Sequence, residues 1–224
     1  MKVNNNGKGR IFKSSVIEFF TKTSPILTLA FYVPLVFFSL LLSRYYFQMN
    51  IDIIIGFYFL GFASWTLLEY FIHRYLFHLQ GNSSFSKRLA YVLHGVHHEF
   101  PRDKERLFMP PLPGFIILIF LLFFFYLFFQ KNVFAFIPGL LNGYLVYSFL
   151  HFNMHTRRPP KFLKRLWSHH ALHHYKQEEV AFGVSSRFWD WFFSTLPEND
   201  KRKVESRSLS LNNEDKVSIR VDSK

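Results

Sequence analysis

The segment IDIIIGFYFLGFASWTLLEYFIHRYLFH, residues 51–78, joins a long apolar run to a pair of histidines. The run Ile51–Ile72 is long enough to cross the roughly 30 Å hydrocarbon core of a bilayer, which takes about 20 helical residues. His73 and His78 follow directly after it. The segment therefore predicts a transmembrane helix that presents two imidazoles at one membrane surface.

Three further apolar stretches accompany this segment: Ile26–Leu42, Phe115–Phe129 and Val133–Leu150. Only the polar residues 130–132 separate the last two stretches, which predicts a tight turn and two helices that cross back to the same side. The first two are joined by the short segment Ser43–Asn50. We therefore predict an all-α integral membrane protein with four transmembrane helices in two hairpins.

The charge distribution predicts which side of the membrane the loops occupy. The chain has 27 Lys and Arg against 15 Asp and Glu, a net charge of +12, and half of its residues are hydrophobic. In the four-helix plan 25 of the 27 basic residues fall on one side, and only Arg44 and Lys131 lie opposite. This bias is typical of cytoplasmic loops, whereas a nucleic-acid partner or a soluble core explains neither the bias nor the apolar runs.

The same plan divides the chain into three parts. We expect residues 1–25 to form a cytoplasmic N-terminal segment that is kept, because no small-residue cleavage site follows a short apolar core. Residues 26–200 are predicted to form the membrane domain, with a cytoplasmic helical cap. The polar residues 201–224 are predicted to be disordered.

The chain contains no cysteine, which excludes disulfides, thiolate-ligated haem, cysteine-held iron–sulfur clusters and a cysteine nucleophile. A bound metal must therefore use histidine or carboxylate ligands. All 11 histidines lie within residues 73–98 and 151–174, each window directly after an apolar hairpin. This clustering predicts a metal centre on the cytoplasmic side.

The spacing of the histidines supports that interpretation. Residues three and four apart share one face of an α-helix, so the histidines at 94, 97 and 98 and those at 170, 173 and 174 form two compact arcs. His73 and His78 are five apart, so we expect them to serve different metals or to straddle a helix end. Ten imidazoles exceed the ligands of one ion and predict a dimetal site. The predicted ligands are His73, His78, His94, His97, His98, His151, His155, His170, His173 and His174, with His169 expected to be structural.

Other chemistries lack their motifs. The sequence has no H-E-x-x-H, no E-x-x-H, no phosphate-binding loop and no dinucleotide fingerprint, so a zincin protease and a ferritin-like di-iron site are not supported. A membrane metal-binding protein without catalytic activity stays open at this point. Glu69, Glu99 and Asp190 are candidates to orient the imidazole N–H groups.

Four strings carry a resemblance to a known family: EYFIHRYLFH, LHGVHHEFPRDKERLFMPP, HFNMH and HHALHHYKQEEVAFGVSSRFWDWFF. Between Glu69 and Pro197 the chain resembles the integral-membrane fatty acid hydroxylase superfamily, which shares its histidine spacing with sterol desaturases. The segments Arg106–Pro111 and Phe182–Asp190 resemble more specifically its fatty acid 2-hydroxylase branch, which acts on sphingolipid N-acyl chains.

The resemblance implies a membrane di-iron oxygenase that hydroxylates C2 of a lipid acyl chain with O2 and an external electron donor. The ten histidines would hold two iron ions, and zinc would fit the same site in a purified form. The chain looks like a stand-alone form without a fused cytochrome b5 domain, which implies a separate cytochrome b5-like or ferredoxin-like donor. A related sterol or lipid desaturase or methyl oxidase is the alternative. The expected location is a bacterial inner membrane or a eukaryotic endoplasmic reticulum.

Overall fold

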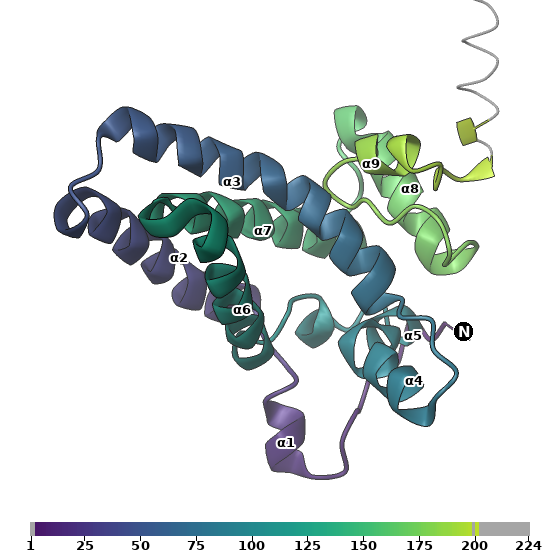
Figure 1. The fold of residues 1–224 in the computed structure, drawn as a ribbon. Coiled ribbons are helices and arrows are strands. Elements are labelled where there is room, and N and C mark those ends of the chain that lie inside the picture. Colours follow the sequence, from purple (N-terminus) through teal and green to yellow (C-terminus); the bar gives the residue numbers. More distant parts are fainter. Residues whose placement is uncertain (1–2, 199, 202–224) are drawn as a thin grey trace, which may run out of the picture.

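We describe the protein from a computed structural model, which describes residues 3–198 and 200–201. Nearly all of the tail predicted to be disordered therefore lies outside the described residues. Every regular element within them is helical (Figure 1). The α-helices are α1 Ser15–Phe19, α2 Pro25–Leu41, α3 Ile51–Phe71, α4 Ser84–Ala90, α5 Val96–Glu99, α6 Pro111–Phe129, α7 Val133–Thr156, α8 Lys164–Tyr175 and α9 Phe188–Phe192.

Shorter π and 3-10 segments extend or connect these helices. The π-helical segments are η1 Leu42–Tyr46, η2 Ile72–Phe77 and η3 Tyr91–Gly95. The 3-10 segments are η4 Lys104–Arg106, η5 Gln130–Asn132 and η6 Lys161–Leu163. Two of the π-helical segments continue long apolar helices, η1 after α2 and η2 after α3, and so lengthen them without a break.

Three helical stretches in the described part of the chain are long and apolar enough to cross a membrane: Pro25–Tyr46, Ile51–Phe77 and Lys104–Thr156. The third stretch contains both α6 and α7. The predicted tight turn between them is confirmed as η5, where Gln130 has a positive φ of 51°. The division into four separate spans and the side on which each end lies remain predictions.

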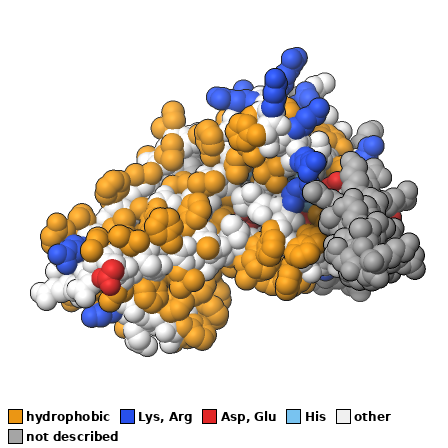
Figure 2. All heavy atoms as spheres, turned by 90° about the horizontal axis from the view of Figure 1, so that it is seen from above, with side chains coloured by type: hydrophobic (Ala, Val, Ile, Leu, Met, Phe, Trp, Pro, Cys, Tyr) orange, Lys and Arg blue, Asp and Glu red, His pale blue; other side chains and the backbone are white. Residues whose placement is uncertain are grey.

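The surface of the body agrees with a bilayer environment. Hydrophobic side chains cover the long part of the molecule, and Lys and Arg side chains gather toward the end that carries the cap (Figure 2). Exposed Phe120, Phe123 and Phe128 project from α6, for example, each with more than 60% of its surface accessible. Such a surface is stable in hydrocarbon, so the chain is a membrane protein.

Helix α7 is the centre of the bundle. It packs most extensively against α3 and next against α2, so the closest packing runs between the two predicted hairpins. More than half of its residues are buried, among them Phe136, Leu140 and Tyr144. Because α7 and α3 both run into histidines, this packing brings the two histidine windows together.

A glycine allows α3 and α7 to approach closely. A Cβ added at Gly139 would overlap the backbone carbonyl of Tyr58 on α3. Gly139→Ala is therefore expected to separate the helices and destabilise the protein by about 1–3 kcal/mol, the usual cost of overpacking. Gly56→Ala is the matched control, because no heavy atom lies within 4 Å of a Cβ there. Thermal unfolding in detergent should show a lower midpoint for Gly139→Ala only; equal midpoints would contradict the close approach.

The cap consists of α4, α5, α8 and α9 at the histidine-bearing ends of the long helices (Figure 1). An N-terminal strap, defined here as residues 9–23, lies against it. Arg106 forms a buried ion pair with Glu18 and donates to the carbonyl of Gly9 at 2.8 Å and 3.0 Å. Asp103 accepts from the Gly9 N–H at 3.0 Å. The strap is thus attached through buried charges.

Glu18→Gln is expected to loosen the strap. The carboxylate accepts from the N–H groups of Ile11 and Phe12 at 3.0 Å and 2.9 Å as well as from Arg106, and hydrogen bonds to charged groups contribute about 1.5–3 kcal/mol. Tryptic cleavage after Lys13 should accelerate by about tenfold. Glu105→Gln, which removes only the exposed Lys22 pair, should change the cleavage rate little. Equal rates in both variants would show that the buried pair does not retain the strap.

Candidate metal centre

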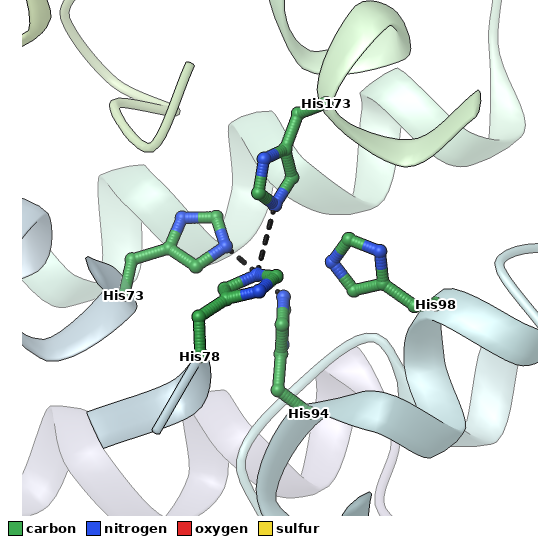
Figure 3. A group of neighbouring side chains, drawn as sticks. All are labelled: His73, His78, His94, His98 and His173. Carbon is green, nitrogen blue, oxygen red and sulfur yellow. Dashed lines mark hydrogen bonds between the residues drawn. The ribbon is translucent and has the colours of Figure 1, made fainter. Parts of the chain in front are cut away.

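Five imidazoles converge in a first group, group A, which consists of His73, His78, His94, His98 and His173 (Figure 3). Each offers one nitrogen, and these nitrogens all lie within 4.8 Å of one another. The Nε2 atoms of His73 and His94 are 3.0 Å apart, as are those of His78 and His173. The group therefore joins the end of α3 to the cap.

The π-helical segment η2 explains how His73 and His78 meet. Its hydrogen bonds join residues five apart, and the N–H of His78 donates to the carbonyl of His73 at 3.1 Å. Both belong to group A, which does not favour the expectation that the two serve different metals. The expectation that they straddle a helix end is confirmed, since His78 caps η2.

A second set, group B, consists of His97, His151, His155, His170 and His174. Its ring nitrogens also lie within 4.8 Å of one another, with 3.0 Å between the Nε2 atoms of His151 and His97 and 2.8 Å between those of His155 and His170. All ten predicted ligands thus lie in the two groups. Each predicted triplet is divided between the two groups. His97 belongs to group B whereas His94 and His98 belong to group A, and His173 belongs to group A whereas its two partners belong to group B.

Backbone carbonyls set the tautomers of three of these histidines. The Nδ1–H groups of His73 and His173 donate to Phe182 O at 2.5 Å and Val180 O at 2.7 Å. That of His151 donates to Leu107 O at 3.1 Å. Donation through Nδ1 leaves the lone pair on Nε2, the atom that faces the other imidazoles, as is usual for metal-ligating histidine.

The loop 180–185 that supplies two of these carbonyls is held by two buried carboxylates. Asp190 accepts from the N–H groups of Phe182 and Gly183 at 2.9 Å and 2.8 Å. Glu69 accepts from those of Val184 and Ser185 at 2.6 Å and 2.8 Å. These two predicted carboxylates thus orient the imidazoles through the loop. The side chain of the third, Glu99, instead accepts from the hydroxyl of Tyr91 at 2.9 Å.

His169 lies outside both groups. Its Nε2 is 3.0 Å from Asp190 Oδ2, and both side chains are fully buried. This position agrees with the expectation that His169 is structural. Although His169 is adjacent to His170, its ring points to Asp190 on α9 and so does not reach group B.

The electrostatics of the cap favour neutral imidazoles. Burial lowers the pKa of His94, His97 and His174 well below the ordinary value, and the neighbouring imidazoles lower it further. For His173 the pKa falls to about 3, mainly through burial and then through His78. Neutral imidazoles carry a free lone pair, which is the form that binds metal ions.

The residues fit metal ions by two further observations. Both ring nitrogens of His98 are buried without a hydrogen-bonding partner among the described residues, which is costly unless something binds them. In addition, the Nε2 separations of about 3.0 Å match two ligands at right angles on bonds of about 2.1 Å. The donor set contains only nitrogen, which suits iron or zinc.

An apolar cavity of about 340 Å³ reaches both groups. His73 and His94 of group A and His97 and His151 of group B line one end of it. From there it extends between α3, α6 and α7 along Leu118, Leu121 and Leu140, among other side chains. The cavity is therefore able to hold a long apolar molecule with one part beside the imidazoles.

Part of the cavity wall was not predicted from the sequence. The strap contributes Ile11, Ile17 and Phe20 to its wall, although it was expected only as a cytoplasmic segment. Tyr32, Trp65 and Tyr144 line it as well. The apolar side chains of the strap are the one feature of its sequence that indicates a buried role. No local pattern shows that they pack against the cavity.

Comparison with known proteins supports these observations. The family model "Fatty acid hydroxylase" matches residues 58–195. Mouse (Mus musculus) fatty acid 2-hydroxylase is 35% identical over 219 residues, 88% of this chain and 59% of the mouse protein. The dihydroceramide fatty acyl 2-hydroxylase FAH2 of Arabidopsis thaliana is 35% identical over 193 residues, 84% of this chain and 80% of the plant protein.

The fold has a counterpart among solved structures. The structure of full-length Scs7p, in which only the hydroxylase domain is visible, superposes with a TM-score of 0.80 at 32% identity and covers 87% of this chain and 74% of that one. The chain spans 59% of the length of the mouse relative. Since the family model covers more than half of its residues and the plant relative matches most of its own length, the chain belongs to the fatty acid hydroxylase family.

Proposed function

We propose that this protein hydroxylates C2 of a lipid acyl chain, on a fatty acid or a sphingolipid N-acyl group. The observation that carries the proposal is the apolar cavity that ends at four imidazoles belonging to both groups. The names of the relatives point the same way, since they describe fatty acid and dihydroceramide fatty acyl 2-hydroxylases. In this reading C2 lies at the imidazole end and the rest of the acyl chain lies along the apolar wall.

The reaction consumes one C–H bond and one O2 together with two electrons and two protons, and yields C–OH and water. Two iron ions, one on group A and one on group B, would supply the activation of O2 and the removal of the hydrogen. The ten histidines are proposed as their ligands. Zinc would bind the same nitrogens, so zinc in a preparation would not argue against iron as the active metal.

The chain itself contributes orientation and exclusion of water. The carbonyls of Val180, Phe182 and Leu107 hold three imidazoles with Nε2 toward the metal positions. The strap and the apolar helices keep the cavity dry, which protects a reactive site from side reactions. Catalysis in this proposal depends on no further side chain acting as an acid, a base or a nucleophile.

We also propose the membrane arrangement and the partners. Four spans, with α6 and α7 as separate crossings, would leave 25 of the 27 basic residues on the face that carries every histidine, which is then cytoplasmic. Residues 1–25 would be a cytoplasmic segment and residues 26–200 the hydroxylase domain. The electrons would come from a separate cytochrome b5-like or ferredoxin-like protein, at the inner membrane of a bacterium or the endoplasmic reticulum of a eukaryote.

The test is a single turnover with a labelled lipid. The purified, iron-loaded protein in lipid nanodiscs is reduced without oxygen, freed of reductant and exposed to O2 with a ceramide whose acyl C2 carries two deuteriums. We expect a product that gains one oxygen and loses one deuterium. The control is the same protein without reduction.

Each other outcome points to a different chemistry. A product that is unsaturated rather than oxygenated would identify a desaturase, and oxidation of an added sterol methyl group would identify a methyl oxidase. Stoichiometric iron binding without any lipid product from the ceramide or from a free fatty acid would contradict the proposed function and favour a metal-binding protein.

A further inference from the structure

A second pocket of about 280 Å³ opens beside the histidine centre, on a different side from the apolar cavity. His155, His170 and His174 of group B line it, together with Arg102, Trp167 and Tyr175. The apolar cavity meets group B through other members, His97 and His151. Group B is therefore approached from two directions, and no residue of group A lines the second pocket.

The second pocket differs from the cavity in its chemistry. Its walls carry three imidazoles, Arg102, Ser168 and Tyr175 beside the apolar side chains of Met154 and Ala171. Trp167 is held in the wall by donation from its indole N–H to Arg157 O at 3.3 Å. About half of this wall is polar, so an acyl chain would gain less here than in the apolar cavity. The pocket is therefore less suited to the acyl chain than the apolar cavity is.

The surface around the pocket is strongly basic. Residues 151–177 include six Lys and Arg and no Asp or Glu. All six are exposed: Arg157, Arg158, Lys161, Lys164, Arg165 and Lys176. Arg102, which lines the pocket, is exposed as well. Lys164 precedes Ser168, a pocket residue, by one turn on the exposed face of α8. Glu178 and Glu179 follow this segment, but its net charge is strongly positive, and such a surface attracts a partner of the opposite sign.

We propose that this basic surface docks an acidic one-electron carrier protein, whose electrons enter group B through the imidazoles of the second pocket. The inference rests on the proposed function, which needs two electrons in each turnover from a donor other than the hydroxylase domain. Two reduced carriers would each dock, lose one electron to the centre and leave oxidised. Entry from this side keeps the carrier away from the lipid. Electron transfer weakens steeply with distance, so histidines that line a pocket open to the surface suit it, even though His170 and His174 are themselves buried.

Membrane headgroups are the competing partner for part of this surface. Arg157 and Arg158 directly follow α7, and Phe162 beyond them is 85% exposed, as expected near a bilayer surface. Arg102 and Lys164 are the better probes, because the first lines the pocket and the second flanks it on α8. Nanodiscs of neutral phosphatidylcholine remove anionic headgroups from the comparison.

The experiment compares two ways of reducing the full-length, iron-loaded protein. Stopped-flow mixing without oxygen follows oxidation of a reduced soluble cytochrome b5 domain, and chemical reduction by dithionite bypasses any docking. The double variant Arg102→Glu with Lys164→Glu reverses two charges. Ser168→Trp fills the pocket without changing the charge. Lys87→Glu on α4 is the control for a charge change elsewhere on the cap, since Lys87 is exposed and does not line the pocket.

In neutral nanodiscs at low salt we expect the double variant to slow reduction by the cytochrome about tenfold or more, with the difference shrinking as salt screens the charges. Ser168→Trp should slow the reduction at every salt concentration, and Lys87→Glu should leave it unchanged. Iron content and product after dithionite reduction should match the wild type in all variants.

Failure of the docking proposal is distinct from failure of the proposed function. Equal cytochrome-driven rates in the wild type and the double variant would overturn the docking proposal. So would a slower rate that appears only in nanodiscs containing anionic phosphatidylglycerol, because the side chains would then serve headgroups. Absence of a lipid product after dithionite reduction of the wild type would instead contradict the proposed function.

Discussion

Replacing His97 with alanine is expected to abolish lipid hydroxylation, reducing it by about a hundredfold or more. His97 is the member of group B that lies at the end of the apolar cavity and within hydrogen-bonding distance of two others, 3.0 Å from His151 and 3.1 Å from His174 between Nε2 atoms. Its loss removes one of the proposed nitrogen ligands and opens a space at the imidazole end of the apolar cavity. Loss of even a group that only orients a ligand costs about 10- to 100-fold in affinity or activity.

The measurement is a comparison of lipids from a host that makes ceramide. The wild-type protein should produce acyl species heavier by one oxygen, and His97→Ala should not. Metal content of the purified variant should fall by about one ion per chain. His169→Asn is the matched control, since this residue is a neighbouring buried histidine outside both groups and asparagine keeps an N–H for Asp190. Identical lipids from the wild type and His97→Ala would contradict the assigned centre.

Replacing Asp190 with alanine is expected to destabilise the cap by about 4 kcal/mol or more. The carboxylate is fully buried and accepts four hydrogen bonds, from the N–H groups of Phe182 and Gly183, the hydroxyl of Thr195 at 2.8 Å and the ring of His169. Each buried donor left without an acceptor costs about 1–3 kcal/mol. The sum is a large part of the usual stability of a folded domain.

The same change should reach group A, because the loop that Asp190 holds orients His73 and His173. We expect a lower thermal midpoint in detergent and a weaker affinity of group A for metal, measured by competition with a chelator. Glu179→Ala is the control, since Glu179 is exposed in the same segment of the chain. A variant that melts earlier but binds metal as tightly as the wild type would show that Asp190 stabilises the cap without orienting the imidazoles.

The membrane character and the candidate ligands were predictable because they depend on local patterns. A run of apolar residues indicates a long helix without knowledge of its neighbours, and α2, α3, α6 and α7 begin or end within a few residues of the predicted stretches, except that α7 continues to Thr156. The spacing of the histidines likewise singled out ten of 11, and these ten are the ones in groups A and B. Their role as iron ligands stays a prediction.

The division of the histidines into two groups was not predictable from spacing alone. An ideal α-helix places residues 94, 97 and 98 on one face, but the structure directs His97 to group B, and along the regular helix α8 it likewise separates His173 from His170 and His174. The i to i+5 pattern of η2 similarly unites His73 with His78. A choice between α and π geometry depends on what packs around the helix, which a spacing rule does not contain.

By itself, the sequence determined the type of protein: apolar runs of membrane length, basic residues concentrated outside those runs, and histidine as the main metal ligand available in a chain without cysteine. Only the tertiary structure decided which imidazoles face one another, how the strap closes over the cavity, and that group B is reached from a second pocket. The physical reason is the distance along the chain over which each effect acts. Hydrophobicity, charge and helical spacing act within one segment, whereas a cavity and a five-nitrogen cluster arise where α3, α5, α7 and α8 meet.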